Sequence, residues 1–146
     1  MECALTIDDV QKRIVEEITR FDEEGIELYE YLVGLGRDMT ASGRGLRTDE
    51  NKISGCQASV WISARAADGK MRYRADSDAL ITKGLLSLLL RVFDGRSPEE
   101  ILEAELFFIE RTGLKAQLSP VRRTGLITMI NRMKELAEER PPDKTL

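Results

Sequence analysis

A single cysteine dominates the chemistry that this chain could perform. Cys56 lies in the segment Ile53-Ser54-Gly55-Cys56-Gln57, and the 146 residues include no histidine. A Ser–His or Cys–His pair, a histidine-bound zinc ion and a histidine proton relay are therefore excluded. Any covalent chemistry has to use a thiol that something other than imidazole activates.

Two interpretations of Cys56 stay open on these residues alone. Free cysteine is among the most buried residue types and commonly packs as a small hydrophobe. Against this, Gly55 is a residue type used where the backbone turns sharply, and the polar Gln57 follows at the expected start of a strand. This context favours a thiol at the tip of a loop, where it could react.

A reactive thiolate needs basic side chains, backbone N–H groups or a helix N-terminus nearby. Arg122 and Arg123 fall in the first turn of a helix expected to begin at Ser119-Pro120, where the helix dipole disfavours cations by about 0.3–1 kcal/mol each. Gly125 costs about another 1 kcal/mol in a helix interior. These departures from local stability predict a functional site there. Solvated arginines, or arginines paired with nearby acids, are the structural alternative.

Other polar residues have structural explanations. Asp76 and Asp78 fit helix caps or first-turn acids, and Trp61 fits sheet packing. A strip of cations on the expected hairpin is most simply its solvent face, although it could dock an acidic partner. The strip consists of Arg65, Lys70, Arg72 and Arg74.

Composition limits the class of protein. Hydrophobic residues make up 42% and charged residues 33% of the chain, and the net charge is −4. This predicts one domain over residues 1–146, with an ordered core over about 5–139 and a flexible tail over 140–146, and argues against nucleic-acid binding. The start shows no secretory signal, and the apolar stretch 79–93 is too short to span a bilayer. We therefore expect a cytoplasmic protein that is not membrane-bound, with Cys3 and Cys56 as free thiols.

Hydrophobic periodicity predicts the elements that position Cys56. A capping box at Thr6 opens a helix through Phe21, and a second helix begins at residues 22–24 and ends at Gly34 and Gly36. A polar loop over 38–51 leads to a short strand at 52–54, so Cys56 falls between two strands. Alternating residues then predict a β-hairpin that turns at Asp68-Gly69.

The second half is expected to be mainly helical. Asp76-Ser77-Asp78 is predicted to cap a buried helix over 79–93, and Ser97-Pro98 to open a short one. The last helix runs from Ser119-Pro120 to a stop at Pro141-Pro142. The predicted class is α+β, with helices packed on a small antiparallel sheet.

Three separated motifs together resemble the SufE family of sulfur acceptor proteins, and the resemblance extends from the first helix to the last. The first is Gly55-Cys56-Gln57 followed by Val60-Trp61, and the second is Asp76-Ser77-Asp78-Ala79 with Lys83-Gly84-Leu85. The third is Leu118-Ser119-Pro120 with Arg122 and Gly125-Leu126.

The resemblance implies a fold shared in outline with IscU-like scaffolds and a function in sulfur transfer. Such a protein accepts sulfane sulfur on Cys56 from a pyridoxal-phosphate cysteine desulfurase of the SufS type, which it stimulates, and delivers it to the SufBCD scaffold for Fe–S clusters. It would carry no cofactor or metal of its own and would be a monomer or weak homodimer. Gly55, Gln57, Asp78 and Arg122 match family positions at the active-site loop and the desulfurase interface.

The chemistry fits these residues independently of the resemblance. Sulfur transfer is a form of thiol–disulfide exchange, which needs a thiolate and access more than an acid–base pair. A carrier must also protect its persulfide, so Cys56 is expected on a loop that tucks inward and swings out. One departure from the family is Ala58, where relatives often have a hydroxyl residue, so the hydrogen bond that orders the loop is expected to be absent or supplied by Ser59.

Two other functions compete with sulfur transfer. A non-covalent module that regulates a desulfurase, with Cys56 purely structural, remains the alternative. A metal or cluster scaffold is disfavoured because two cysteines and no histidine do not make an ordinary ligand set.

Overall fold

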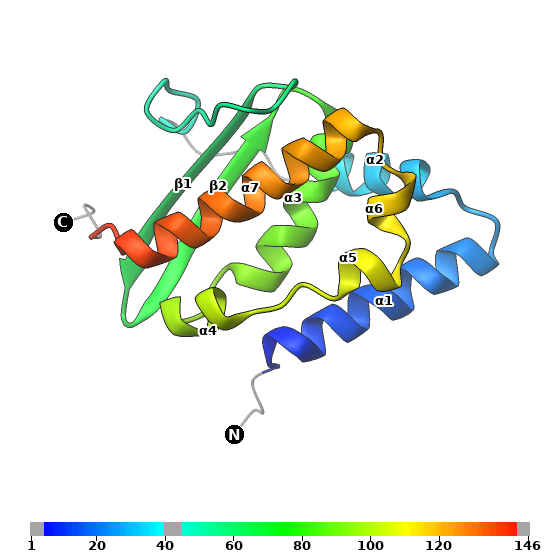
Figure 1. Ribbon diagram of the computed structural model, residues 1–146, viewed down its shortest axis with the longest axis horizontal. Helices are drawn as coiled ribbons and strands as arrows, with labels where there is room; N and C mark the ends of the chain where they lie inside the picture. Colours follow the sequence, from blue (N-terminus) through cyan, green and yellow to red (C-terminus); the bar gives the residue numbers. More distant parts are fainter. Residues whose placement is uncertain (1–4, 40–44, 143–146) are drawn as a thin grey trace.

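A two-stranded antiparallel sheet lies along one side of the molecule, and helices pack on one of its faces (Figure 1). The computed structural model describes residues 5–39 and 45–142, so Cys3 lies outside the described residues. The sheet consists of β1 (Val60–Ala67) and β2 (Lys70–Ser77), and helices α3 (Leu80–Phe93) and α7 (Pro120–Glu139) pack against it. This arrangement confirms the predicted α+β class with a small antiparallel sheet.

The hairpin has the register and the turn that its sequence predicts. Ala67 pairs with Lys70 across a two-residue turn in which Asp68 and Gly69 both have positive φ, as a tight hairpin of this length requires. Along β2, Met71 and Tyr73 are buried, and Lys70, Arg72 and Arg74, which alternate with them, are exposed. One face of the sheet therefore belongs to the core and the other faces solvent.

The first helix follows the prediction and the second does not. α1 (Ile7–Glu23) begins with a capping box between Thr6 and Asp9, as the sequence indicates. Residues 22 and 23, which were expected to open the second helix, end the first one. α2 (Leu28–Asp38) begins after Glu27 and continues through Gly34 and Gly36, which were wrongly predicted to end it.

Close packing between α2 and α3 explains why α2 continues. Gly36 of α2 and Gly84 of α3 allow the two helices to lie against each other. A Cβ atom at Gly36 would lie 2.2 Å from the Leu80 carbonyl oxygen, and one at Gly84 would lie 2.2 Å from the Leu32 carbonyl oxygen. Carbon and oxygen atoms cannot approach so closely, so only glycine fits at either position. Tertiary packing here outweighs the low helix propensity of glycine.

The start of α3 also differs from the prediction. β2 continues through Ser77, and the N-cap of α3 is Ala79, which makes no side-chain capping bond. Asp76 is buried and accepts hydrogen bonds from the Ser77 N–H at 2.8 Å and from Arg47 Nε at 2.9 Å. The acidic cluster therefore serves the hairpin and its neighbouring loop instead of capping a helix.

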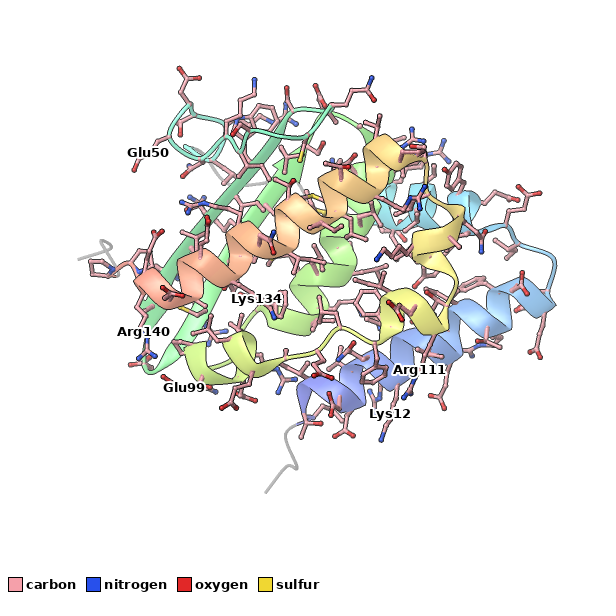
Figure 2. The ribbon with its side chains drawn as sticks, in the orientation of Figure 1. Lys12, Glu50, Glu99, Arg111, Lys134 and Arg140 are labelled. Carbon is pink, nitrogen blue, oxygen red and sulfur yellow. The ribbon has the colours of Figure 1, made fainter. Side chains whose placement is uncertain are left out.

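Of the remaining helices, one lies beside the hairpin turn and the others connect α1 with α7 (Figure 1). α4 (Pro98–Glu103) begins with the predicted capping box at Ser97, and the short α5 (Phe108–Arg111) and α6 (Leu114–Gln117) lead into α7. Lys134 of α7 donates to the Ala104 carbonyl at 2.9 Å, and Arg140 pairs with Glu99 (Figure 2). These contacts fix α7 against the segment around α4.

The chain remains attached to the sheet after α7. The Ala66 N–H donates to the Pro141 carbonyl at 2.6 Å, and Pro142 forms a parallel bridge with Ala66. Pro141 and Pro142 therefore pair with β1, although they fall in the range 140–146 predicted as a flexible tail. Residues 143–146 lie outside the described residues, and a single domain over the whole chain stays a prediction.

Over residues 5–39 and 45–142, no helix is both long enough and apolar enough to cross a bilayer.

Candidate functional site

Backbone hydrogen bonds fold the segment before β1 into a narrow loop that carries Cys56. The Ile53 N–H donates to the Val60 carbonyl, and the Ile62 N–H donates to the Asn51 carbonyl, both at 2.9 Å. The strand predicted at residues 52–54 is reduced to one bridge, between Lys52 and Trp61. Cys56 therefore lies in a tight connection between this bridge and β1, and not between two strands as predicted.

Gly55 allows this loop to lie against α7. Its φ is +94°, a region that side chains other than glycine rarely adopt. A Cβ atom there would also come within 3.4 Å of the Thr128 side chain. The backbone conformation therefore requires the glycine before Cys56, while the contact with Thr128 alone would tolerate a Cβ atom.

Asp78 holds the other end of the loop. Its carboxylate Oδ1 accepts a hydrogen bond from the Ser59 N–H at 3.1 Å, and its own N–H donates to the Ser59 carbonyl at 3.3 Å. The Ser77 hydroxyl donates to the same carbonyl at 2.8 Å. The end of the loop is thus held through the backbone of Ser59.

Four of the predicted site residues meet at one cavity of about 360 Å³. Cys56 and Gln57 come from the loop, Asp78 follows β2, and Arg122 lies in the first turn of α7. Gly55 does not line the cavity but adjoins Cys56 in the loop. Segments that are distant in the sequence thereby bring their polar groups to the thiol.

The sulfur of Cys56 rests against α7 in a half-buried position. Its Sγ lies 3.8 Å from the Gly125 carbonyl oxygen, a distance at which a thiol can donate a weak hydrogen bond. A Cβ at Gly125 would be 3.7 Å from the same sulfur. The glycine that weakens the last helix therefore faces the thiol.

The surroundings of the thiol favour its neutral form. Burial raises the pKa of Cys56 above the ordinary value of a thiol. Arg122 does not offset this effect, because its guanidinium lies over the Tyr29 ring, 5.5 Å from the ring centroid. Arg123 does not line the cavity, and its buried Nε has no hydrogen-bond partner among the described residues. The expectation that these arginines activate the thiol is not met in this conformation.

This raised pKa gives a pH-dependent prediction. In a Cys3→Ser background, alkylation of folded Cys56 by iodoacetamide should accelerate about tenfold per pH unit from about pH 7 to 9 without a plateau, because only the thiolate reacts. The same thiol in urea should react several-fold faster at pH 7.5 and level off above about pH 8.5. A plateau below pH 8 in the folded protein would contradict the geometry described here.

Thr82, Val121 and Met129 line the cavity but were not identified from the sequence. Val121, Gly125 and Met129 are spaced four residues apart, which places them on one side of α7, and Thr82 and Leu85 line the cavity from α3. The four-residue spacing was a usable signal. On α3, Leu85 belongs to one of the three motifs, but nothing in the sequence indicates that Thr82 lies on the face of this apolar helix that meets the loop.

A metal centre has no visible basis in this region. Within residues 5–39 and 45–142, no three cysteine, aspartate or glutamate side chains are grouped so that they could hold a metal ion.

A family model and several known proteins match most of this chain. A family model described as "SufE: Fe-S metabolism associated domain" matches residues 12–137. An uncharacterized SufE-like protein of Synechocystis is 36% identical over 125 residues, which cover 86% of this chain and 78% of that protein. An uncharacterized SufE-like protein of Rhizobium meliloti is 35% identical, with 84% of this chain and 91% of that protein covered.

Two further matches extend the comparison. SufE-like protein 1 of Arabidopsis thaliana, named as chloroplastic or mitochondrial, is 34% identical over 90% of this chain but only 36% of its own length. The solution structure of a hypothetical protein from Thermus thermophilus superposes with a TM-score of 0.72 at 22% identity, covering 90% of this chain and 95% of that one. That structure supports the fold alone.

Proposed function

This chain belongs to the SufE family, which is associated with Fe–S metabolism, and on that premise we propose that it accepts sulfur on Cys56 from a cysteine desulfurase. The donor would be a pyridoxal-phosphate enzyme of the SufS type, and the acceptor would be the SufBCD scaffold. The observation that carries the proposal is the cavity where Cys56 meets Gln57, Asp78 and Arg122.

The transfer step balances without an external oxidant or reductant. The Cys56 thiolate attacks the outer sulfur of the donor's persulfide, forming a new S–S bond on Cys56 while the donor's S–S bond breaks. The donor cysteine leaves as a thiolate, and Cys56 becomes a persulfide. Delivery to the scaffold repeats the exchange with Cys56 as the leaving group.

Cys56 has to leave its resting position for this reaction. In the described conformation the sulfur faces a carbonyl oxygen, which stabilises a thiol and disfavours a thiolate. Movement of the loop away from α7 would expose the sulfur and lower its pKa. The return movement would place a persulfide beside Gly125, where no side chain occupies the space.

Arg122 and Asp78 would have different roles when the Cys56 loop moves. Arg122 lines the cavity, and its guanidinium would pair with an anionic sulfur on Cys56 once the loop has moved. Asp78 anchors the loop at Ser59, so the mobile part would be limited to the residues around Cys56. The cytoplasmic location expected from the sequence remains a prediction.

Mass spectrometry tests the proposal directly. After incubation with a SufS-type desulfurase and cysteine, the intact protein should gain the mass of one or more sulfur atoms, and peptide mapping should place them on Cys56. Reduction with dithiothreitol should remove the added mass. Absence of any adduct on Cys56, with the desulfurase demonstrably active, would rule out the transfer.

A further inference from the structure

Tyr29 of α2 presents its aromatic ring to Arg122, the arginine at the Cys56 cavity. The guanidinium carbon of Arg122 lies 5.5 Å from the ring centroid, a distance at which the face of an aromatic ring attracts a cation. The Tyr29 hydroxyl donates to the carbonyl of Gln117 at 3.2 Å, and Gln117 is the last residue of α6. The ring is therefore fixed at both ends, to α2 through its own backbone and to α6 through its hydroxyl.

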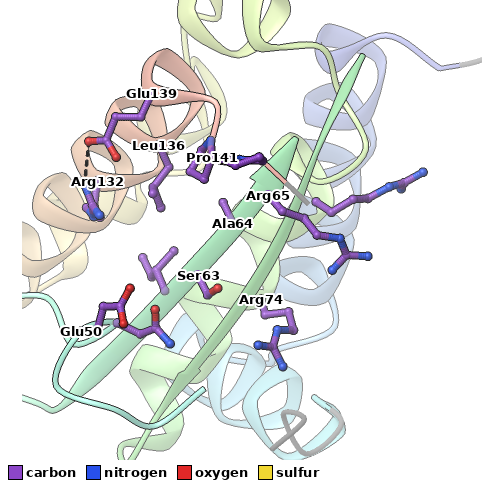
Figure 3. A pocket seen from close by; sticks show the side chains of 13 residues that line it. Glu50, Ser63, Ala64, Arg65, Arg74, Arg132, Leu136, Glu139 and Pro141 are labelled. Atoms are coloured by element: carbon purple, nitrogen blue, oxygen red, sulfur yellow. Dashed lines mark hydrogen bonds and ion pairs between the residues drawn. The ribbon is translucent and has the colours of Figure 1, made fainter. Parts of the chain in front are cut away.

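Arg122 differs from a second arginine of the same helix in what holds it. Arg132 pairs with Glu135 at 3.2 Å and with Glu139 at 3.3 Å, and the second contact is drawn in Figure 3. Within the part of the chain that the structure describes, no carboxylate forms an ion pair with Arg122. A guanidinium that rests on a ring is held less firmly than one paired with carboxylates, so Arg122 can change its partner.

Helix spacing brings the sulfur of Cys56 within reach of Arg122. Gly125 follows Arg122 by three positions in α7, and residues at this spacing are neighbours on one face, with about 5–6 Å between their Cβ positions. A Cβ at Gly125 would lie 3.7 Å from Cys56 Sγ. The long arginine stem covers the remaining distance. The guanidinium thus has two alternative partners, the Tyr29 ring and the sulfur.

The other charge at the cavity is already engaged. Among the residues that line the Cys56 cavity, Asp78 and Arg122 are the charged ones. The Asp78 carboxylate accepts from the Ser59 N–H at 3.1 Å and belongs to the loop anchor. While Arg122 rests on the ring, no cation of the cavity lining faces the sulfur. An anionic sulfur gains such a cation only when Arg122 leaves Tyr29.

We propose that Tyr29 is a positioning residue that keeps the Arg122 guanidinium away from Cys56 until an anionic sulfur draws it off the ring. The stack favours a neutral thiol at rest and keeps a cation in reserve for the reaction. The inference deepens the proposed function and rests on it for its purpose. Its test uses alkylation, which needs only a thiolate, so the test can fail while sulfur loading of Cys56 succeeds.

Alkylation of Cys56 in a Cys3→Ser background measures the effect of the stack. Tyr29→Leu removes the ring and keeps apolar bulk, and at about pH 7.5 it should speed the reaction with iodoacetamide about two- to fivefold, the factor that matches a partly exposed cation–π contact. Tyr29→Phe keeps the ring face and should restore the original rate. Negatively charged iodoacetate should gain more than neutral iodoacetamide in Tyr29→Leu, because the released cation lies beside the sulfur.

A double variant shows whether Tyr29 acts through Arg122. In an Arg122→Gln background, Tyr29→Leu should no longer change the alkylation rate, because the cation that it would release is absent. Arg132→Gln is the matched control, since it removes a charge from the same helix outside the Cys56 cavity and should leave the effect of Tyr29→Leu intact. A Tyr29→Leu effect that persists without Arg122 would show that the variant merely opens the cavity, and would contradict the inference.

NMR follows the guanidinium without any change at Tyr29. In the Cys3→Ser protein the δ-methylene protons of Arg122 should resonate at high field because of the Tyr29 ring, and they should shift back as the pH is raised through ionisation of Cys56. Cys56→Ser should lack this shift, which separates the thiol from other ionising groups. High-field resonances that persist after Cys56 has ionised would overturn the inference, as would an unchanged alkylation rate in folded Tyr29→Leu.

Discussion

Replacement of Cys56 by serine is expected to abolish sulfur loading and to return the desulfurase to its rate in the absence of this protein. A serine hydroxyl does not form a persulfide, and it is not ionised at neutral pH. The change should be nearly neutral for stability, within about 1 kcal/mol, because the side chain is only half-buried and its hydrogen bond to the Gly125 carbonyl is weak. The measurement is sulfide and alanine production by the desulfurase.

The same variant separates the two functions that the sequence left open. A non-covalent regulator should retain its stimulation in Cys56→Ser, whereas a sulfur acceptor should lose it. Ser54→Ala is a matched control, because Ser54 is an exposed residue of the same loop that does not line the Cys56 cavity. Full stimulation by Cys56→Ser would exclude sulfur acceptance as the basis of activity.

The sequence predicted those parts of the site that depend on local order. Cys56, Gly55 and Gln57 lie in one loop, and Ser119 caps α7 as its sequence indicates, with its side chain accepting from the Arg122 N–H. Hairpin register followed from the Asp68-Gly69 turn, whose positive φ values match those residue types. In each case a few neighbouring residues determine the conformation.

The parts that the sequence did not reveal depend on contacts between distant segments. Asp78 resembles a helix cap in sequence, yet its carboxylate bonds to Ser59, and no local pattern indicates that partner. Arg122 lies at the predicted helix start, but its stacking on Tyr29 removes it from the resting thiol. The motifs therefore predicted a candidate site, while tertiary contacts set the resting surroundings of its thiol.

Gly34 and Gly36 show, within one helix, the same difference between what local sequence predicts and what distant contacts determine. Both were predicted to end the helix because glycine has low helix propensity, but both lie inside α2. A Cβ at Gly36 would meet the Leu80 backbone, whereas one at Gly34 would meet nothing within 4 Å. Only the packing of α3 distinguishes these two positions.

Alanine at these two positions should therefore change stability in opposite directions. Gly36→Ala should lower the free energy of unfolding by about 2–3 kcal/mol, because α2 and α3 must move apart to relieve a carbon–oxygen distance of 2.2 Å. Gly34→Ala should raise it by about 0.5–1 kcal/mol, since the unfolded chain loses freedom and no clash results. Urea unfolding followed by Trp61 fluorescence and far-ultraviolet circular dichroism measures both.

Gly84→Ala extends this prediction to the functional site. Its Cβ would lie 2.2 Å from the Leu32 carbonyl oxygen, so we expect a loss of about 2–3 kcal/mol here too. Displacement of α3 would also move Thr82 and Leu85, which line the Cys56 cavity, and should speed alkylation of Cys56 before global unfolding is detected. Because Gly36 and Gly84 belong to one helix contact, their double variant should cost less than the sum of the single variants. Additive losses, or a stabilised Gly36→Ala variant, would show that α2 and α3 do not approach as closely as described.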